Sequence, residues 1–430
     1  MFLCLKGGGS IKRLVLIFIL VSSSYAETIK ISGEDAVRMA LDNNLDIKNA
    51  KYREKIKKLY KDNSWNVFIP SLGVNAGLSR TPSFIFNAGE KDYWGVGIGA
   101  SANLVLNLSV FKKIKLTIFD YESAKINREK AIKSIRLGVL KMCNELIALK
   151  ITLEVLESQL KNSKLKYEQA RIAYNNGLLS ELDYLDIKLK YDKSQPTLDE
   201  QIINFEKLKE EFKLLIGLDI LQDFEIIGEL SGEMLDFSLI NEVIDVNESL
   251  DIRAINNSYN SIQKSLDAIW LDTFLPSFSF RISYSGSIPF SSSSVGLKND
   301  FSASLGLQYN LTEMLPFSGN FTNIWDKDFQ LEILRNQVSN EIRKFKSSIV
   351  YKRKDVRRYK SILDASRMNL ELARKNYQMA FDAFNSGGID ILKLNDIEVS
   401  YKKSDLQFIR DKLNYANAVL EYKDLINALD

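Results

Sequence analysis

The chain has 430 residues, with 58 lysines and arginines against 55 aspartates and glutamates, no histidine and two cysteines. A formal net charge of +3 is too small to indicate a nucleic-acid-binding surface. The absence of histidine excludes Ser-His-Asp catalysis and histidine-ligated metals. Cys4 and Cys143 are too few for a zinc site or a disulfide framework. With only six prolines, the composition favours long helices.

Residues 1–26 have the pattern of a signal peptide. The short apolar run Leu14–Val21 precedes Ser24 and Ala26, the small residues expected before a cleavage site. A bilayer-spanning helix needs about 20 apolar residues, so this run is too short to be one. The alternative is a buried N-terminal helix. We expect an exported protein whose leader carries the entire excess of basic residues, Lys6, Lys12 and Arg13.

Two segments in the first half, at about 71–80 and 94–107, alternate apolar residues with glycine and small polar residues. In the first segment Leu72, Val74 and Leu78 fall on one face, and Gly73 and Asn75 fall on the other. Segments of about 10 residues with this period predict strands of a membrane barrel. Soluble hairpins packed on helices are the alternative.

A helical hairpin is predicted next, at about 109–216. Apolar residues from Ile135 to Tyr174 alternate spacings of four and three, which indicates coiled-coil packing between helices. Gly177 ends the first helix, and a second helix returns from about Glu181. A helix of some 60–70 residues is a rod of roughly 90–105 Å. Pro196 predicts a kink or an interruption in the returning helix.

The second half repeats this order, with strands at about 277–286 and 301–311 and a helical hairpin at about 317–429. Leu153, Leu160, Tyr167 and Gly177 recur in register as Leu363, Leu370, Tyr377 and Gly387. The sequence therefore predicts an internal duplication. Its parts are a first repeat at 27–216, an inter-repeat segment at 217–250 and a second repeat at 251–430.

Four strands cannot close a barrel, for which about eight are the practical minimum. Open strand edges are forbidden in hydrocarbon, so strands that face lipid require several chains to share one barrel. The same assembly gathers the helical hairpins into a ring beneath that barrel. This geometry predicts a conduit.

Four short motifs, read with the duplication, carry a resemblance to a known family. Two precede the strands, at Trp65–Leu72 and Trp270–Phe278, and two form the hairpin tips, at Ala173–Asp183 and Ala383–Ile391. With them the chain resembles the TolC-like outer membrane efflux protein family over essentially its whole mature length. The resemblance implies a mainly α fold with a membrane β-barrel part. It implies a homotrimer with a shared barrel of about 12 strands, a long α-helical tunnel and a small mixed belt.

The resemblance also implies a function, that of an outer-membrane exit channel in a tripartite efflux or type I secretion system. Such a channel passively conducts drugs, small molecules or proteins, and has a long periplasmic extension. The implied partners are a periplasmic adaptor protein and an inner-membrane pump, which supplies the energy. No enzymatic activity, cofactor or metal is expected. The alternative is a soluble periplasmic or surface coiled-coil adaptor or adhesin.

The tips carry the candidate site residues. The resemblance places the adaptor-docking loops at Gly177, Leu178, Ser180, Gly387, Gly388 and Asp390. It places the periplasmic entrance or gate at Asp183, Asp186, Phe384, Lys393 and Asp396. Lys393 stands where the family commonly has an acidic residue. For Asp183 and Asp390, helix capping is the alternative role, because acids in the first turn complement the helix dipole.

Overall fold

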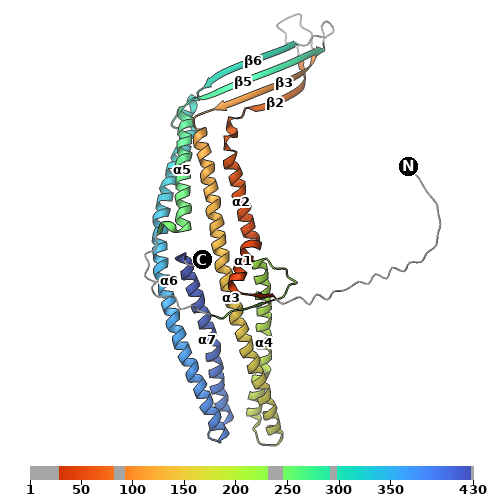
Figure 1. The fold of residues 1–430 in the computed structure, drawn as a ribbon, viewed down its shortest axis with the longest axis vertical. Coiled ribbons are helices and arrows are strands. Elements are labelled where there is room, and N and C mark those ends of the chain that lie inside the picture. The colour runs from red at the N-terminus through yellow and green to blue at the C-terminus, as the bar shows by residue number, and fades with distance from the viewer. Residues whose placement is uncertain (1–28, 82–92, 231–245, 291–297, 428–430) are drawn as a thin grey trace, which may run out of the picture.

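The computed structural model describes residues 29–81, 93–230, 246–290 and 298–427. The molecule is elongated, with a four-stranded sheet at one end and the tips of two helical hairpins at the other (Figure 1). The predicted signal peptide and most of the loops between paired strands lie outside the described residues. The predicted fold class of four strands and long helical hairpins is confirmed.

The sheet is antiparallel and has the strand order β2-β3-β5-β6. Its strands are β2 (Ser71–Thr81), β3 (Tyr93–Leu106), β5 (Ser277–Phe290) and β6 (Lys298–Gln308). Strands β3 and β5 come from different repeats and pair at its centre, while β2 and β6 are its open edges. The sheet thus joins the two repeats and leaves one free edge from each.

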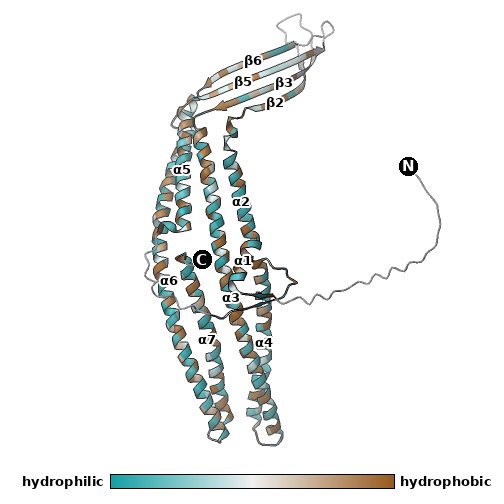
Figure 2. Ribbon diagram, in the orientation of Figure 1, coloured by the Kyte–Doolittle hydropathy of each residue, from teal (hydrophilic) through white to brown (hydrophobic). Residues whose placement is uncertain are grey.

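The register of the sheet places apolar residues opposite apolar residues. Val74 pairs with Ala100, which pairs in turn with Tyr284, and Tyr284 pairs with Phe301. Because successive side chains alternate between faces, these residues share one face. Gly99 and Ser285 pair on the opposite face. Hydrophobic and hydrophilic residues accordingly alternate along the strands in Figure 2.

Two long hairpins form the helical part of the chain. Helix α3 (Val110–Asn175) and helix α4 (Glu181–Ile216) make the first, and α6 (Gly319–Asn385) and α7 (Ile391–Leu425) make the second. The 66 residues of α3 give a rod of about 100 Å. Pro196 lies inside α4, which continues through it, so Pro196 does not interrupt the helix.

Two further helices, which the sequence analysis does not predict, extend from the strands along the long helices. Helix α2 (Leu45–Asp62) packs on α3, and α5 (Leu250–Phe274) packs on both α3 and α6. Short 3-10 helices flank the sheet at Ser64–Phe68 and Leu311–Met314, and another, Val246–Glu248, precedes α5. No helix in the described part of the chain is long and apolar enough to cross a membrane.

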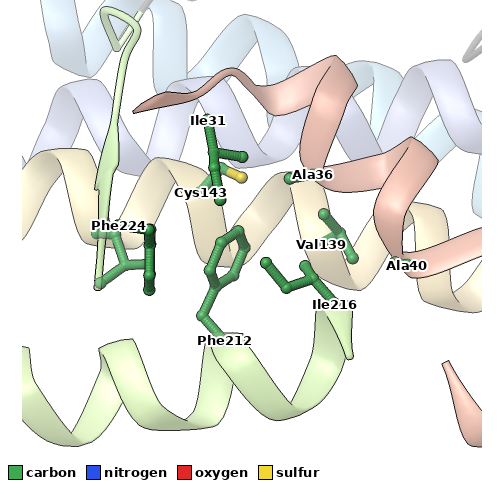
Figure 3. Packing of buried hydrophobic residues seen from close by; sticks show 9 residues of the cluster. Ile31, Ala36, Ala40, Val139, Cys143, Phe212, Ile216 and Phe224 are labelled. Atoms are coloured by element: carbon green, nitrogen blue, oxygen red, sulfur yellow. The ribbon is translucent and has the colours of Figure 1, made fainter. Parts of the chain in front are cut away.

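A mixed layer surrounds the first hairpin at mid-height. Helix α1 (Gly33–Asn43) follows strand β1 (Ile29–Ile31), which pairs in parallel with β4 (Phe224–Ile226) of the inter-repeat segment. Phe212 of α4 is fully buried and stacks at a tilt on Phe224. Figure 3 shows this core, which joins β1, α1, α3, α4 and β4. It fixes the start of the described chain against the hairpin.

An ion-pair cluster ties the two repeats together at the same level. Glu421 of α7 contacts both Lys141 of α3 and Lys352 of α6. The side chains of Asn144 and Asn417 hydrogen-bond nearby at 3.2 Å. Because Lys141 and Lys352 belong to different repeats, Glu421 bridges the two hairpins.

Candidate functional site

The two hairpin tips have the same backbone structure. Gly177 and Gly387 adopt left-handed conformations, with φ angles of 72° and 75°. The next residue in each case donates its backbone N–H to a carbonyl five residues earlier, Leu178 to Ala173 and Gly388 to Ala383. This is the Schellman arrangement, in which glycine ends a helix without strain. The matching tip motifs thus produce two equivalent, sharply turned loops.

Side-chain caps begin the helix that follows each tip. The Ser180 hydroxyl accepts a hydrogen bond from the backbone N–H of Asp183 at 3.1 Å and donates one to the Asp183 carboxylate. Asp390 accepts a hydrogen bond from the backbone N–H of Lys393 at 2.7 Å. The capping role expected as the alternative for Asp183 and Asp390 is therefore present in the structure.

The remaining candidate entrance residues lie further along the same helices. Asp186 forms an ion pair with Lys190 at 2.7 Å, one turn later on α4. Lys393 and Asp396 are exposed on α7, and Phe384 is half-buried at the end of α6. Within the part of the chain that the structure describes, no hydrogen bond or ion pair joins the candidate residues of one tip to those of the other.

The tip of the first hairpin also presents apolar side chains. Leu178 is 80% exposed, and Leu182, in the first turn of α4, is similarly exposed. Scattered exposed leucines are common, but two at one hairpin tip offer apolar surface for contact with another molecule. Leu178 is among the residues that the family resemblance assigns to docking.

The sheet is a second candidate functional surface, because its apolar face is not covered by other parts of the described chain. Side chains at the two edges are the most exposed, and Leu72, Val74 and Leu305 are all at least 80% exposed. A soluble monomer rarely exposes a contiguous apolar patch of this kind. The face and the two open edges therefore mark a surface that another apolar phase or another chain covers.

The structure also brings together charged residues that the sequence analysis does not select. Lys166 of α3 and Lys402 of α7 both contact the buried carboxylate of Glu398. Glu421 holds its two lysines in the same manner. The sequence offers one signal for the ion pairs of Glu421. Lys352 occupies a position in the apolar stripe where a coiled coil normally has an apolar residue.

Metal binding has no support at these positions. Among the described residues, no group of three or more cysteines, aspartates or glutamates could hold a metal ion. The arrangement at the tips offers hydrogen bonding, charge and apolar contact, which are means of recognition and gating.

Comparison with known proteins gives one family match, which covers part of the chain. Residues 36–198 match the family model described as outer membrane efflux protein. Comparison with curated proteins gives no match.

Solved structures resemble the chain over nearly all of its length. The Campylobacter jejuni CmeC outer membrane channel has a TM-score of 0.76 and 14% identity, covering 92% of this chain and 85% of that chain. The open state of the Neisseria gonorrhoeae MtrE outer membrane channel has a TM-score of 0.72 and 17% identity, covering 93% of this chain and 89% of that chain. The outer membrane protein VceC from Vibrio cholerae has a TM-score of 0.71 and 12% identity, covering 92% of this chain and 95% of that chain. At these identities the likeness shows a shared fold.

Proposed function

Because residues 36–198 match the outer membrane efflux protein family model and the fold is that of solved outer membrane channels, we propose that three copies of this chain form the exit duct of a tripartite efflux or type I secretion system. The protein is an outer-membrane exit channel for efflux systems. One observation supports this function above all, namely the sheet register that places one continuous apolar face across both repeats. Such a face matches the lipid-facing side of barrel strands.

The open edges of the sheet support the trimer. Each chain supplies four strands, and the outer strands β2 and β6 leave backbone N–H and C=O groups unpaired. In hydrocarbon an unpaired backbone group costs several kcal/mol, so β6 of one copy must pair with β2 of the next. Three copies then close a barrel of about twelve strands, within the range of known membrane barrels.

The organisation along the chain follows from this proposal. Residues 27–216 and 251–430 form two structural repeats, and 217–250 contributes to a belt around the hairpins. The hairpins of three copies form the wall of a periplasmic tunnel. Cargo passes through it passively, and an inner-membrane pump supplies the energy. We assign no enzymatic activity to the chain.

The tips form the periplasmic entrance in this proposal. The loops at Gly177, Leu178, Ser180, Gly387, Gly388 and Asp390 dock a periplasmic adaptor protein. Asp183, Asp186, Phe384, Lys393 and Asp396 lie at the entrance. The exposure of Lys393 and Asp396 supports their place at the pore, because neither residue is buried by packing within the chain. Three copies of Asp396 around a narrow opening favour cations.

Conductance tests the channel and its entrance together. The purified protein in planar lipid bilayers should give discrete conductance steps with a preference for cations. Asp396→Ala should reduce that preference, and Lys393→Asp should increase it, since each variant changes the charge of every copy at the opening. Reversal potentials in a salt gradient measure the preference.

Fractionation provides the control for location and assembly. The protein should require detergent for extraction and should be recovered as a trimer from the outer-membrane fraction. Recovery as a soluble protein without detergent would instead support the coiled-coil adaptor or adhesin. An unchanged reversal potential in both variants would remove Asp396 and Lys393 from the entrance while leaving the channel itself intact.

A further inference from the structure

A cavity of about 250 Å³ lies where α3, α4 and α7 meet, on the tip side of the hairpins. It opens between the two hairpins, which are separate in the sequence, since α4 ends at Ile216 and α6 begins at Gly319, but which run side by side in Figure 1. Its polar lining is dominated by amines and amides, and the residues that matter are Lys166, Lys190, Lys193, Asn395, Glu398 and Lys402.

The charges around this cavity are unbalanced. Glu398, whose side chain is only 8% exposed, contacts Lys166 and lies 2.8 Å from the Nζ atom of Lys402. Lys190 is paired with Asp186, which lies outside the lining. Lys193 has no ion pair within the described part of the chain. Four lysines of the lining thus have two carboxylates as partners, and part of the excess positive charge is that of Lys193, which is exposed.

The pKa values of two of these lysines are lowered. Burial, together with the positive charges of Lys402 and Lys190, lowers the pKa of Lys166 to about 8. Burial also lowers the pKa of Lys402. A lysine whose pKa is lowered in this manner carries its charge at a cost in free energy, which a nearby anion offsets. The cavity thus holds positive charge that the chain itself does not neutralise.

One residue of the cavity lining has a buried donor without a partner. Asn395 is 5% exposed and lines the cavity, and its side-chain Nδ2 atom is buried without a hydrogen-bond acceptor among the described residues. An unsatisfied buried donor is unfavourable, so the site favours a ligand that supplies acceptor oxygens. Positive charge and an unused N–H group together describe the complement of an oxyanion.

The cluster is particular to one of the two repeats. When the repeats are aligned on Tyr167 and Tyr377, Asn376 stands at the position of Lys166. In the same alignment Lys188 stands at the position of Glu398. The duplication therefore does not reproduce this cluster, so its composition is not a general requirement of hairpin packing.

We propose that this cavity binds a small oxyanion, of the sulfate, phosphate or carboxylate class, through Asn395 and the ammonium groups of Lys166 and Lys402. The space suits such a ligand, because a cavity of about 250 Å³ is several times the roughly 30 Å³ that one water molecule occupies in the liquid. The bound anion would bridge α3 and α7, and so join the two hairpins.

Sulfate is the appropriate probe, because it remains a dianion over the pH range in which Lys166 titrates. Isothermal titration of sulfate into the full-length protein in detergent, at constant ionic strength and pH 7, should give saturable binding. Lys166→Met should weaken it roughly tenfold or more, since a charged hydrogen bond is lost. Lys164→Met is the matched control, because Lys164 is exposed on the same helix and lies outside the cavity.

Two further variants distinguish a binding site from a structural ion pair. Asn395→Asp, which keeps the shape and adds a negative charge, should abolish sulfate binding. Glu398→Gln should tighten binding severalfold, because Glu398 competes with the anion for the same two lysines. Thermal unfolding of each variant checks that it is folded. Absence of saturable binding in both the wild type and Glu398→Gln, or equal weakening by Lys164→Met and Lys166→Met, would overturn the proposal. The readout does not depend on conductance, so it is independent of the proposed channel function.

Discussion

At the scale of single residues, backbone conformation explains why certain glycines are placed as they are. Gly217 ends α4 with a φ angle of 69°, and a Cβ atom added there would lie 2.5 Å from the Cβ of Asn43. Both the left-handed conformation and the close approach to α1 exclude a side chain. Gly138, inside α3, has open space around it. Glycine is therefore required at position 217, whereas position 138 has room for a side chain.

Substitution of each glycine by alanine should have opposite effects. Gly217→Ala should destabilise the protein by at least about 1–2 kcal/mol, because alanine is strained in the left-handed region and clashes with Asn43. Gly138→Ala should stabilise it by about 0.5–1 kcal/mol, because glycine inside a helix is costly. Thermal unfolding in detergent, followed by circular dichroism, measures both changes. A Gly217→Ala protein as stable as wild type would contradict the conclusion that this turn excludes a side chain.

At the scale of secondary-structure elements, the hairpins are held together by charge as well as by apolar packing. Burial alone raises the pKa of Glu421, but hydrogen bonds from Lys141 and Lys352 outweigh it and the pKa is lowered from its ordinary value of 4.5. A carboxyl whose pKa is lower in the folded protein than in the unfolded chain contributes stability above the unfolded value. That contribution is lost as the pH falls through the folded value.

Glu421→Gln should therefore destabilise the protein at neutral pH by roughly 1–3 kcal/mol, because two partly exposed lysines lose their carboxylate partner. The difference from wild type should shrink as the pH falls below about 4.5, where the unfolded carboxyl becomes protonated, and should be lost as the pH falls through the lower pKa of the folded carboxyl. Thermal unfolding midpoints at pH 7 and pH 4 measure it. Glu371→Gln, on an exposed face of α6, is the control and should have little effect at either pH. A pH-independent difference would show that Glu421 acts through packing alone.

At the scale of the whole molecule, the apolar face of the sheet determines where the protein resides. Leu305 of β6 is 80% exposed and lies on this face, whereas Ser302 of the same strand lies on the opposite face. A lysine on the lipid side of a membrane strand costs about 2–4 kcal/mol near the midplane, and much less on the other side.

Leu305→Lys should therefore strongly reduce the amount of the protein in the outer-membrane fraction, and Ser302→Lys should leave it nearly unchanged. Quantitative immunoblotting of fractionated cells, with total protein as the reference, measures both. If the sheet instead packed in water, the two variants would accumulate equally.

Much of this architecture was predictable from local periodicity. Strands and heptad helices appear in the sequence because every second or every third to fourth residue is apolar, and the tip glycines because only glycine ends a helix in the left-handed conformation without strain. Helices α2 and α5 are not predicted from the sequence, and the structure shows α2 packed on α3 and α5 packed on both α3 and α6. The sequence predicts helix capping only as an alternative role, to a place at the entrance for Asp183 and to adaptor docking for Asp390, and the structure contains both capping hydrogen bonds.

The sequence by itself determined the repeat, the strands, the hairpins and the resemblance to outer-membrane channels, since each rests on residues close together in the chain. Only the tertiary structure decided which charges meet. Lys166 reaches Glu398, and Lys141 and Lys352 share Glu421, because the folded hairpins place α3 beside α7. Contacts between residues so far apart leave no periodic trace in the sequence. The pairing of β1 with β4 and the oxyanion cavity have the same origin, since both arise where separate segments pack together.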